Sequence, residues 1–157
     1  FLLSLIPVLF GLDYRSSLKK RRDLFLNLKS FVIFVKEQIR FCGRERNEIF
    51  ALSDLNPEFN NDFFKVIKKA LKNREDLTKT FDEYNDIRLK PKEINEINTF
   101  FTELGKSDTE GQINHCDYYI NLFGQAGKVL SDTYVTKSRL VSGLSLSLTA
   151  AMFIIMI

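Results

Sequence analysis

A run of apolar and small residues with a seven-residue repeat lies in the second half of the chain. These side chains alternate three and four positions apart, at Ile113, Cys116, Ile120, Phe123, Gly127, Leu130 and Tyr134. Such spacing keeps one stripe on one face of an α-helix and is typical of helices that pack lengthwise on a neighbour. We therefore predict a long helix that begins at Ser107 and runs unbroken toward the end of the chain.

A second long helix is predicted from Leu18 to Cys42. Its apolar residues follow mostly the same spacing, and further ones at Leu24, Phe31 and Phe34 widen the stripe. A wide stripe favours a bundle, in which one helix meets more than one neighbour. Gly43 is well placed to end this helix.

Shorter helices are predicted between the two long ones. They are expected at residues 47–55, after Pro57, around residues 77–84, and from Pro91 to Gly105. The sequence shows no convincing strand pattern. The expected fold class is all-α: an antiparallel helical bundle of about six helices, flanked by two transmembrane helices. The short helices are expected to cover the end of the bundle far from the membrane.

The flanking spans are predicted from the uncharged ends of the sequence, residues 1–12 and residues 140–157. A transmembrane helix needs about 17–25 residues, so the second segment is long enough and the first is expected to be the end of a longer span. A cleaved signal peptide is the alternative for the first segment, but Asp13, Tyr14 and Arg15 follow it instead of small residues. Residues 13–139 would form a cytoplasmic helical bundle.

Basic residues follow the first uncharged segment and precede the second. They are Arg15, Lys19, Lys20, Arg21, Arg22, Lys137 and Arg139. The positive-inside rule places these flanks in the cytoplasm, where they would contact anionic membrane lipids. The two cysteines lack a disulfide spacing, which also fits a reducing compartment. Because lipid explains the basic cluster, nucleic acid is not an expected partner.

Acidic residues dominate the middle of the chain. One group is a candidate docking surface for a basic partner, expected at the far end of the bundle: Glu75, Asp76, Asp82, Glu83 and Asp86. The alternative is an ordinary solvated face. In the second uncharged segment, Gly143, Ser147 and Ala151 recur every four residues and would suit packing against another span. A homo-oligomer is therefore possible.

Residues 104–119 hold the only histidine and one of the two cysteines, His115 and Cys116. Adjacent residues point about 100° apart on a helix, so these two cannot converge on one metal ion. Cys116 lies in the apolar stripe and is expected to be a core residue with a raised pKa, with His115 at the rim. We predict no catalytic residue, no cofactor and no metal, and hence no enzyme.

The acidic residues of this stretch have a local explanation. Ser107 followed by Glu110 is the pattern of a capping box, in which the two side chains satisfy backbone N–H groups at the start of a helix. Asp108 in the first turn suits the positive end of the helix dipole. With Gly105 ending the preceding helix, the stretch is expected to be a helix, a tight turn and a helix.

The order of these motifs resembles the stage III sporulation protein AB family. The opening part matches at Gly11, Tyr14, Ser17, Leu18, Lys19, Arg21, Glu37, Ile39 and Phe41. The turn resembles the family's Leu-Gly-x-Ser-Asp-x-x-x-Gln at Leu104, Gly105, Ser107, Asp108 and Gln112. The chain departs from the family pattern after the first long helix, where residues 43–46 replace a Pro-Leu pair, and near Phe81 or Tyr84, where a tryptophan is usual.

The resemblance implies a role in endospore-forming bacteria, in the mother cell membrane around the forespore. Family members resemble the cytoplasmic domains of platform proteins in type II secretion and type IV pilus machines. The implied partners are the secretion-type ATPase of the same operon and the other components of a channel complex. Two alternatives are a platform protein of a secretion or pilus machine outside sporulation, and a membrane-tethered helical scaffold without an ATPase.

Overall fold

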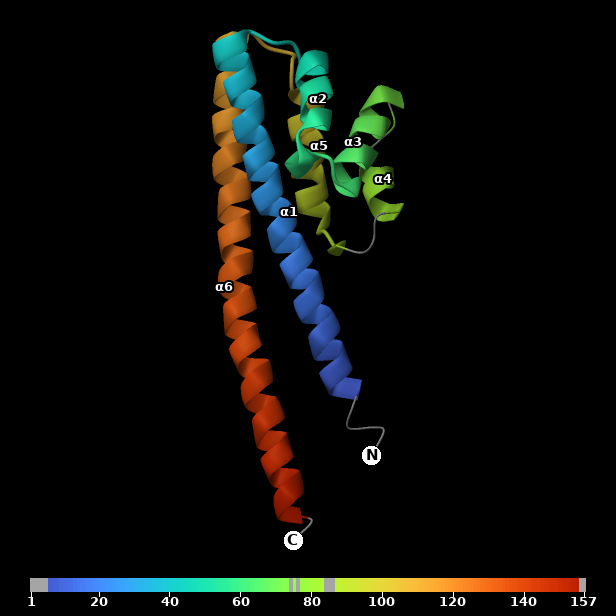
Figure 1. Cartoon of the computed structure of the whole chain (residues 1–157), viewed down its shortest axis with the longest axis vertical. Helices are drawn as coiled ribbons and strands as arrows, with labels where there is room; N and C mark the ends of the chain where they lie inside the picture. The colour runs from blue at the N-terminus through green and yellow to red at the C-terminus, as the bar shows by residue number, and fades with distance from the viewer. Residues whose placement is uncertain (1–5, 74, 76, 84–86, 156–157) are drawn as a thin grey trace.

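The computed structural model describes the backbone of residues 6–73, 75, 77–83 and 87–155, and the side chains of residues 15–73, 75, 77–81, 87–137, 139 and 140 (Figure 1). Within these ranges the regular elements are six α-helices and one short 3₁₀ turn, with no strand. They are α1 (Ile6–Cys42), α2 (Arg46–Leu55), the 3₁₀ turn (Pro57–Phe59), α3 (Asp62–Asn73), α4 (Leu77–Glu83), α5 (Pro91–Glu103) and α6 (Thr109–Ile155). The all-α prediction is confirmed.

The two long helices, α1 and α6, lie side by side and antiparallel (Figure 1). The Phe25 and Phe123 rings meet between them with centroids 5.9 Å apart. Gly127 allows the helices to approach closely, since an added Cβ there would lie 3.1 Å from the Leu26 side chain. The start of α1 and the end of α6 therefore lie at the same end of the molecule.

The opposite end, called the tip below, consists of the end of α1, the start of α6, and the two turns at residues 43–45 and 104–108 (Figure 1). The four short helices lie beside the α1–α6 pair, next to its half nearer the tip, and do not cover the tip. The prediction that they cap the far end is wrong. The connections from α1 to α2 and from α5 to α6 are both short. A short connection makes the following helix run back alongside the preceding one, so α2 and α5 lie beside the long helices.

The core is built from phenylalanine rings that several helices contribute. Phe31 of α1 lies at the centre: its ring centroid is 4.9 Å from that of Phe64 in α3 and 5.7 Å from that of Phe101 in α5. Phe59 in the 3₁₀ turn meets the same ring edge-on at 5.3 Å. All four rings are buried. Each buried phenylalanine stabilises the fold by about 1.5–3 kcal/mol, so this cluster fixes the short helices against α1.

The ends of the helices follow local signals in the sequence. Gly43 has φ +59° and ends α1, and Gly105 has φ +87° and follows α5. Both lie in the left-handed region that glycine tolerates best. Pro91 begins α5, where its missing N–H leaves no partner unsatisfied.

Helices α1 and α6 continue without a break beyond the predicted borders of the bundle at residues 13 and 139. The side chains of residues 1–14 and 141–157 lie outside the described residues. In the described part of the chain, no helix has a stretch both long and apolar enough to cross a membrane. The flanking transmembrane helices at residues 1–12 and 140–157 stay predictions.

Candidate functional site

The turn between α5 and α6 forms part of the tip. Leu104 is buried at the end of α5, whereas Ser107 and Glu110 are exposed. The backbone N–H of Gly111 donates to Asp108 Oδ1 at 3.0 Å, so the side chain that caps α6 is that of Asp108. The predicted capping box of Ser107 and Glu110 is therefore wrong. The capping residue is Asp108, one position later, and α6 begins at Thr109.

The remaining residue of the predicted turn motif, Gln112, also stabilises this turn. Its side-chain Nε2 donates to the backbone carbonyl of Ser107 at 2.8 Å. Asp108 and Gln112 thus hold the chain entering α6 from two sides. The predicted order of a helix, a tight turn and a second helix is confirmed, with Asp108 as the capping residue of the second helix.

Gly111 also contributes to this turn, although it is not part of the predicted turn motif. A Cβ added there would lie 2.7 Å from Asp108 Oδ1 and 2.9 Å from Ser107 Cβ, which is closer than such atoms can approach. The Asp108 cap therefore needs glycine three residues later. The signal in the sequence was an aspartate followed at the third position by glycine.

His115 packs against α5, and Cys116 is part of the buried core. The Cys116 side chain is fully buried, and burial, aided by Asp117, raises the pKa of its thiol to about 12. His115 stacks on the Phe100 ring at 5.5 Å, and its Nε2 donates to the Phe100 carbonyl oxygen at 3.2 Å. His115 is half-buried, so it is at the rim of the core as predicted.

The histidine also contacts Tyr119, whose ring centroid is 4.8 Å from that of His115. The pKa of Tyr119 is raised mainly by burial, and the neighbouring Tyr118 raises it further. No cluster of three or more histidine, cysteine or acidic residues suited to a metal occurs in the described part of the chain. His115, Cys116 and Tyr119 therefore contribute to the packing in and beside the core.

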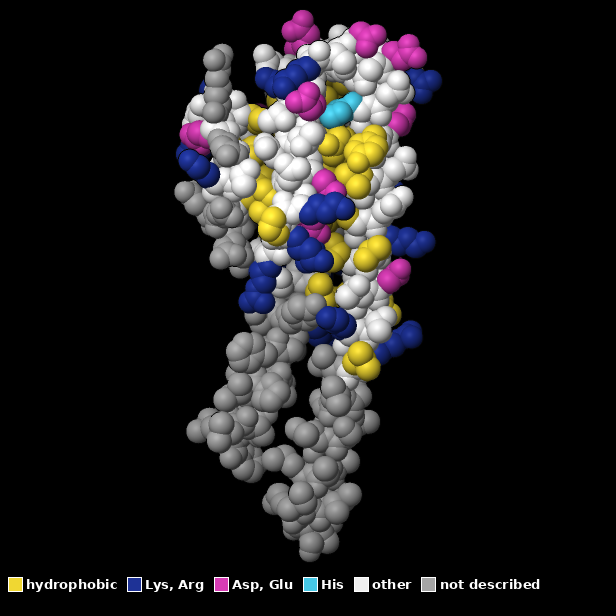
Figure 2. Space-filling view, turned by 180° about the vertical axis from the view of Figure 1, so that it is seen from behind, with side chains coloured by type: hydrophobic (Ala, Val, Ile, Leu, Met, Phe, Trp, Pro, Cys, Tyr) yellow, Lys and Arg dark blue, Asp and Glu magenta, His cyan; other side chains and the backbone are white. Residues whose placement is uncertain are grey.

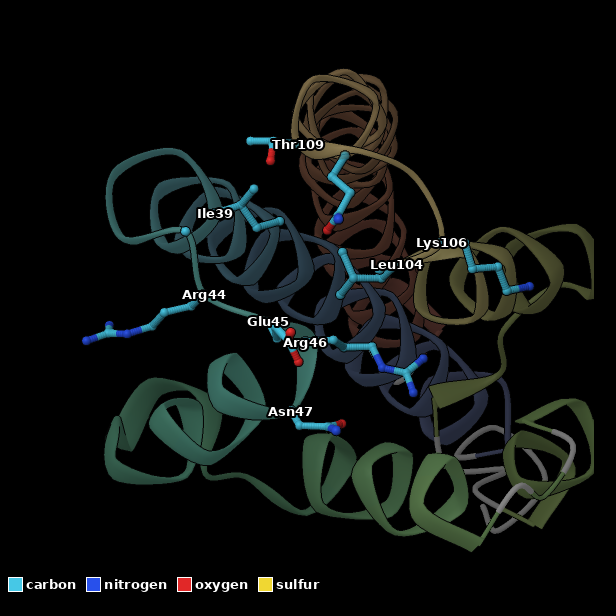
Figure 3. A pocket seen from close by; sticks show the side chains of 11 residues that line it. Ile39, Arg44, Glu45, Arg46, Asn47, Leu104, Lys106 and Thr109 are labelled. Atoms are coloured by element: carbon cyan, nitrogen blue, oxygen red, sulfur yellow. The ribbon is translucent and has the colours of Figure 1, made fainter.

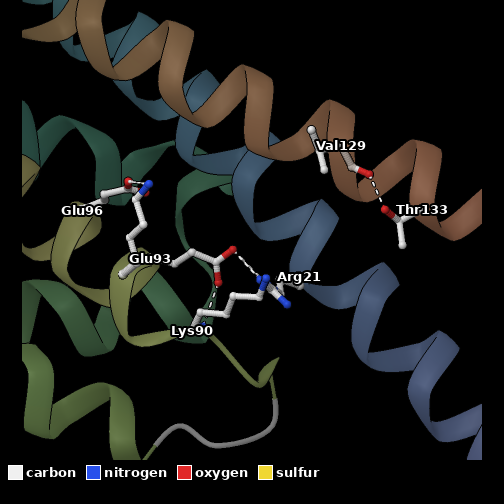
Figure 4. Close-up of polar contacts among 7 residues, drawn as sticks. Arg21, Lys90, Glu93, Glu96, Val129 and Thr133 are labelled. Atoms are coloured by element: carbon white, nitrogen blue, oxygen red, sulfur yellow. Dashed lines mark hydrogen bonds and ion pairs between the residues drawn. The ribbon is translucent and has the colours of Figure 1, made fainter.

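The structure separates the predicted membrane-surface residues into two groups. Arg21 turns into the body and forms an ion pair with Glu93 of α5 at 2.5 Å, with both side chains mostly buried (Figure 4). Glu93 Oε2 also accepts the backbone N–H of Lys90 at 2.8 Å, which caps α5. Arg21 is therefore a structural residue, and its assignment to the membrane surface is wrong.

The other basic residues lie at the surface of the α1–α6 pair. The guanidinium groups of Arg15 and Arg22 lie 5.9 and 5.4 Å from the Tyr134 ring centroid. The two arginines are about two turns apart on α1. Arg22 also pairs with Asp23 at 2.6 Å. The remaining members are exposed or half-buried: Lys19, Lys20, Lys137 and Arg139.

Charge is unevenly distributed over the face seen in Figure 2. Acidic side chains gather around the tip, and lysine and arginine side chains are more frequent toward the end where the described residues stop. The acidic residues at the tip include Glu103, Asp108 and Glu110, all exposed. They were not in the predicted docking group.

The predicted docking group lies elsewhere. Asp82 and Glu83 belong to α4, which lies on the flank of the molecule and not at the tip (Figure 1). Their side chains, together with Asp76 and Asp86, lie outside the described residues. Glu75 is exposed and accepts a hydrogen bond from Asn73 Nδ2 at 2.8 Å. The expected position at the far end was wrong because α3 and α4 fold back beside α1.

A cavity of about 600 Å³ lies between the two turns of the tip. Residues 43–47 line one side and residues 104–106 the other, with Ile39, Thr109 and Gln112 completing it. The Arg44 and Lys106 side chains point to opposite sides (Figure 3). These two cations therefore do not converge on one bound ion, and the cavity is a cleft between two turns.

Comparison with known proteins identifies the family. No curated protein and no solved structure gave a significant match. The sequence profile of the family described as stage III sporulation protein AB (spore_III_AB) matches residues 1–157, the whole chain. This match covers the α1–α6 pair, the short helices and the turn at residues 104–112. The chain belongs to the stage III sporulation protein AB family.

Proposed function

We propose that the chain is a non-enzymatic, membrane-anchored platform component of a secretion-like channel complex between mother cell and forespore. In this role it couples a cytoplasmic secretion-type ATPase to the membrane assembly. Membership of the family implies a role at stage III of sporulation. The observation that carries the mechanical part is the antiparallel α1–α6 pair, which links the uncharged ends of the chain to the tip without interruption (Figure 1).

Membrane anchoring is supported by the placement of the two ends. Residues 1–12 and 140–157 carry no charge, and the helices that lead to them end on the same side of the molecule. Arg15, Lys19 and Arg139 lie next to these segments, where anionic lipid would attract them. The positive-inside rule then puts the bundle on the cytoplasmic side of the mother cell membrane around the forespore.

Force transmission is supported by the packing between α1 and α6. Besides the Phe25–Phe123 contact, Lys36 Nζ pairs with Asp117 Oδ1 at 2.6 Å near the tip. A helix pair held by close-packed side chains moves as a unit, because a packed interior deforms little. A load applied to the tip or flank would therefore reach the membrane end of both helices.

The predicted docking group remains our candidate contact with a basic surface of the ATPase. Its members are Glu75, Asp76, Asp82, Glu83 and Asp86. If they serve this role, replacing Glu75, Asp76, Asp82 and Glu83 by lysine should abolish the contact while leaving the helical content unchanged. A folded variant that still binds the partner would exclude this surface and leave the rest of the proposal intact.

The central experiment separates the platform from a plain scaffold. Full-length protein is isolated from membranes of sporulating cells, and the associated proteins are identified. We expect a secretion-type ATPase to co-purify, and we expect deletion of the gene to stop spore development after engulfment. A developmental block without any associated ATPase would favour the membrane-tethered scaffold.

A variant of the helix pair tests the coupling itself. Gly127→Leu inserts a side chain against Leu26 and should lower the yield of heat-resistant spores while the ATPase stays bound. Gln125→Leu is the matched control, since Gln125 is exposed on the same helix. Equal spore yields from the two variants would contradict coupling through the α1–α6 pair.

A further inference from the structure

We propose that the groove between α2 and α3 is the docking site for one amphipathic helix of a partner protein, with acidic residues beside its apolar stripe. The groove has a volume of about 510 Å³. The two helices that form it, α2 and α3, lie beside the half of the α1–α6 pair that is nearer the tip (Figure 1). This surface differs from the acidic group on the flank, and the proposal does not depend on the identity of any ATPase.

The floor of the groove is apolar and backed by the core. Phe50 of α2 lines it, and its ring stacks on Phe31 of α1 with centroids 6.2 Å apart. Phe50 also contacts Phe101 of α5 at 6.2 Å. Ala51 and Leu71 complete the apolar surface, Ala51 being exposed and Leu71 half-buried. This floor is therefore supported from behind and offers apolar area that remains in contact with water.

One end of the groove is held at a set width by an ion pair. Lys68 Nζ of α3 lies 2.5 Å from Asp54 Oδ1 of α2, and the lysine side chain is only 14% exposed. The same Nζ lies 3.5 Å from the carbonyl oxygen of Phe59. These contacts tie α2 to α3, so the groove is formed before a partner binds, which lowers the entropy lost on binding.

The other end of the groove is positive. Arg46 and Lys72 line it, and neither forms an ion pair with another residue in the described ranges. Because Asp54 already compensates the charge of Lys68, Arg46 and Lys72 leave the groove with a net positive charge. Charge complementarity therefore selects a partner with carboxylates next to its apolar residues.

The shape of the groove favours a helix as the occupant. Its α2 side runs from Arg46 to Asp54, about 12 Å at 1.5 Å per residue, which matches about two turns of a docked helix. Apolar grooves between two helices bind amphipathic helices through residues spaced three and four apart. A second copy of this chain is a poor occupant, since the apolar stripes of α1, α5 and α6 in the described residues already face its own core.

Binding at this groove would act directly on a long helix. The contact of Phe50 with Phe31 places the docked helix one side chain away from α1. A partner that pulls or pushes on α2 and α3 therefore acts on α1 through packed aromatic rings.

The test uses the full chain in membranes of sporulating cells, with a photo-crosslinking amino acid in place of Ala51. A second protein carries the same amino acid at Asn121, an exposed position on α6 outside the groove. We expect the Ala51 position to crosslink to a segment with apolar residues three and four apart and with acidic flanks. A crosslink to lipid, to a second copy of this chain, or no more than at Asn121 would overturn the proposal.

Charge reversal supplies a second, independent measurement. Arg46→Glu with Lys72→Glu should lower the crosslink yield at least tenfold, and reversing the acidic residues of the captured segment should restore it. The control is Lys69→Glu with Lys79→Glu, which changes the net charge equally at exposed positions outside the groove. Equal yields from the two charge variants, each with an unchanged thermal midpoint, would refute an acidic partner.

Discussion

Arg21 of α1 and Glu93 of α5 form an ion pair at 2.5 Å in which the arginine side chain is 12% exposed and the glutamate side chain 14% (Figure 4). The pair connects residues that are 72 positions apart in the sequence. Glu93 also caps α5 through the Lys90 N–H. A single carboxylate thus starts one helix and attaches it to another.

Loss of this pair should destabilise the bundle. Arg21→Ala leaves the mostly buried Glu93 carboxylate without its cation, and we expect the free energy of unfolding to fall by about 2 kcal/mol. Lys19→Ala, at an exposed position two residues away, should change it by less than about 0.5 kcal/mol. Urea unfolding of the two variants and of Glu93→Ala, analysed as a double-mutant cycle, measures the coupling. An Arg21→Ala variant as stable as Lys19→Ala would show that the pair contributes little.

Two glycines in α6 should respond in opposite directions to alanine. At Gly111 the new Cβ would collide with Asp108 Oδ1 and displace the cap, so we expect a loss of about 1 kcal/mol. At Gly124 the nearest atom is Lys29 Cδ at 3.5 Å, an ordinary contact, so the better helix propensity of alanine should add about 0.5–1 kcal/mol. Thermal unfolding of the two variants measures the contrast. A stabilised Gly111→Ala protein would mean that the Asp108 cap is dispensable.

Stability should decline in alkaline solution. Burial raises the pKa of Cys116 from 9.0 to about 12 in the folded protein. Between these values the unfolded chain binds fewer protons than the folded one, so stability falls as pH rises, by up to about 1.4 kcal/mol per unit. Below pH 9 this contribution is fully retained. Urea unfolding from pH 8 to 11 should show the decline.

Two variants assign this pH dependence to residues. Cys116→Ala should remove part of the alkaline slope, because it removes the buried thiol. Tyr119→Phe should also reduce the slope, since burial raises the pKa of Tyr119 as well. Slopes in both variants as steep as that of the unaltered protein would argue against titration of these buried groups.

The two cysteines also test the membrane orientation. Cys42 is exposed at the tip, whereas Cys116 is buried. In intact cells that express the protein without sporulating, so that it enters the outer cell membrane, a membrane-impermeant maleimide should leave both cysteines unlabelled, and after permeabilisation it should label Cys42 alone. Labelling of the Cys42→Ser protein under the same conditions provides the background. Modification of Cys42 from outside intact cells would place the tip on the opposite side of the membrane and exclude contact with a cytoplasmic ATPase.

Only part of the candidate site can be predicted from the sequence. The residues of the turn at 104–112 were identified, because glycine, aspartate and helix periodicity act over a few neighbouring positions. The choice of Asp108 over Ser107 as the cap was missed, since both residue types suit that position and only the hydrogen bond from the Gly111 N–H to Asp108 distinguishes them. The α2–α3 groove was missed because it forms only when two helices lie side by side.

Local patterns in the sequence are enough to predict the all-α class, the two long helices and most helix ends, because periodic apolar residues, prolines and glycines act on the backbone within a few residues of themselves. Three features could be seen only in the folded chain. The short helices lie beside α1 and α6, Arg21 pairs with Glu93, and the Phe31 ring contacts rings from α2, α3 and α5. Those contacts join distant parts of the chain, and they depend on where short turns send each helix and on how the side chains then pack.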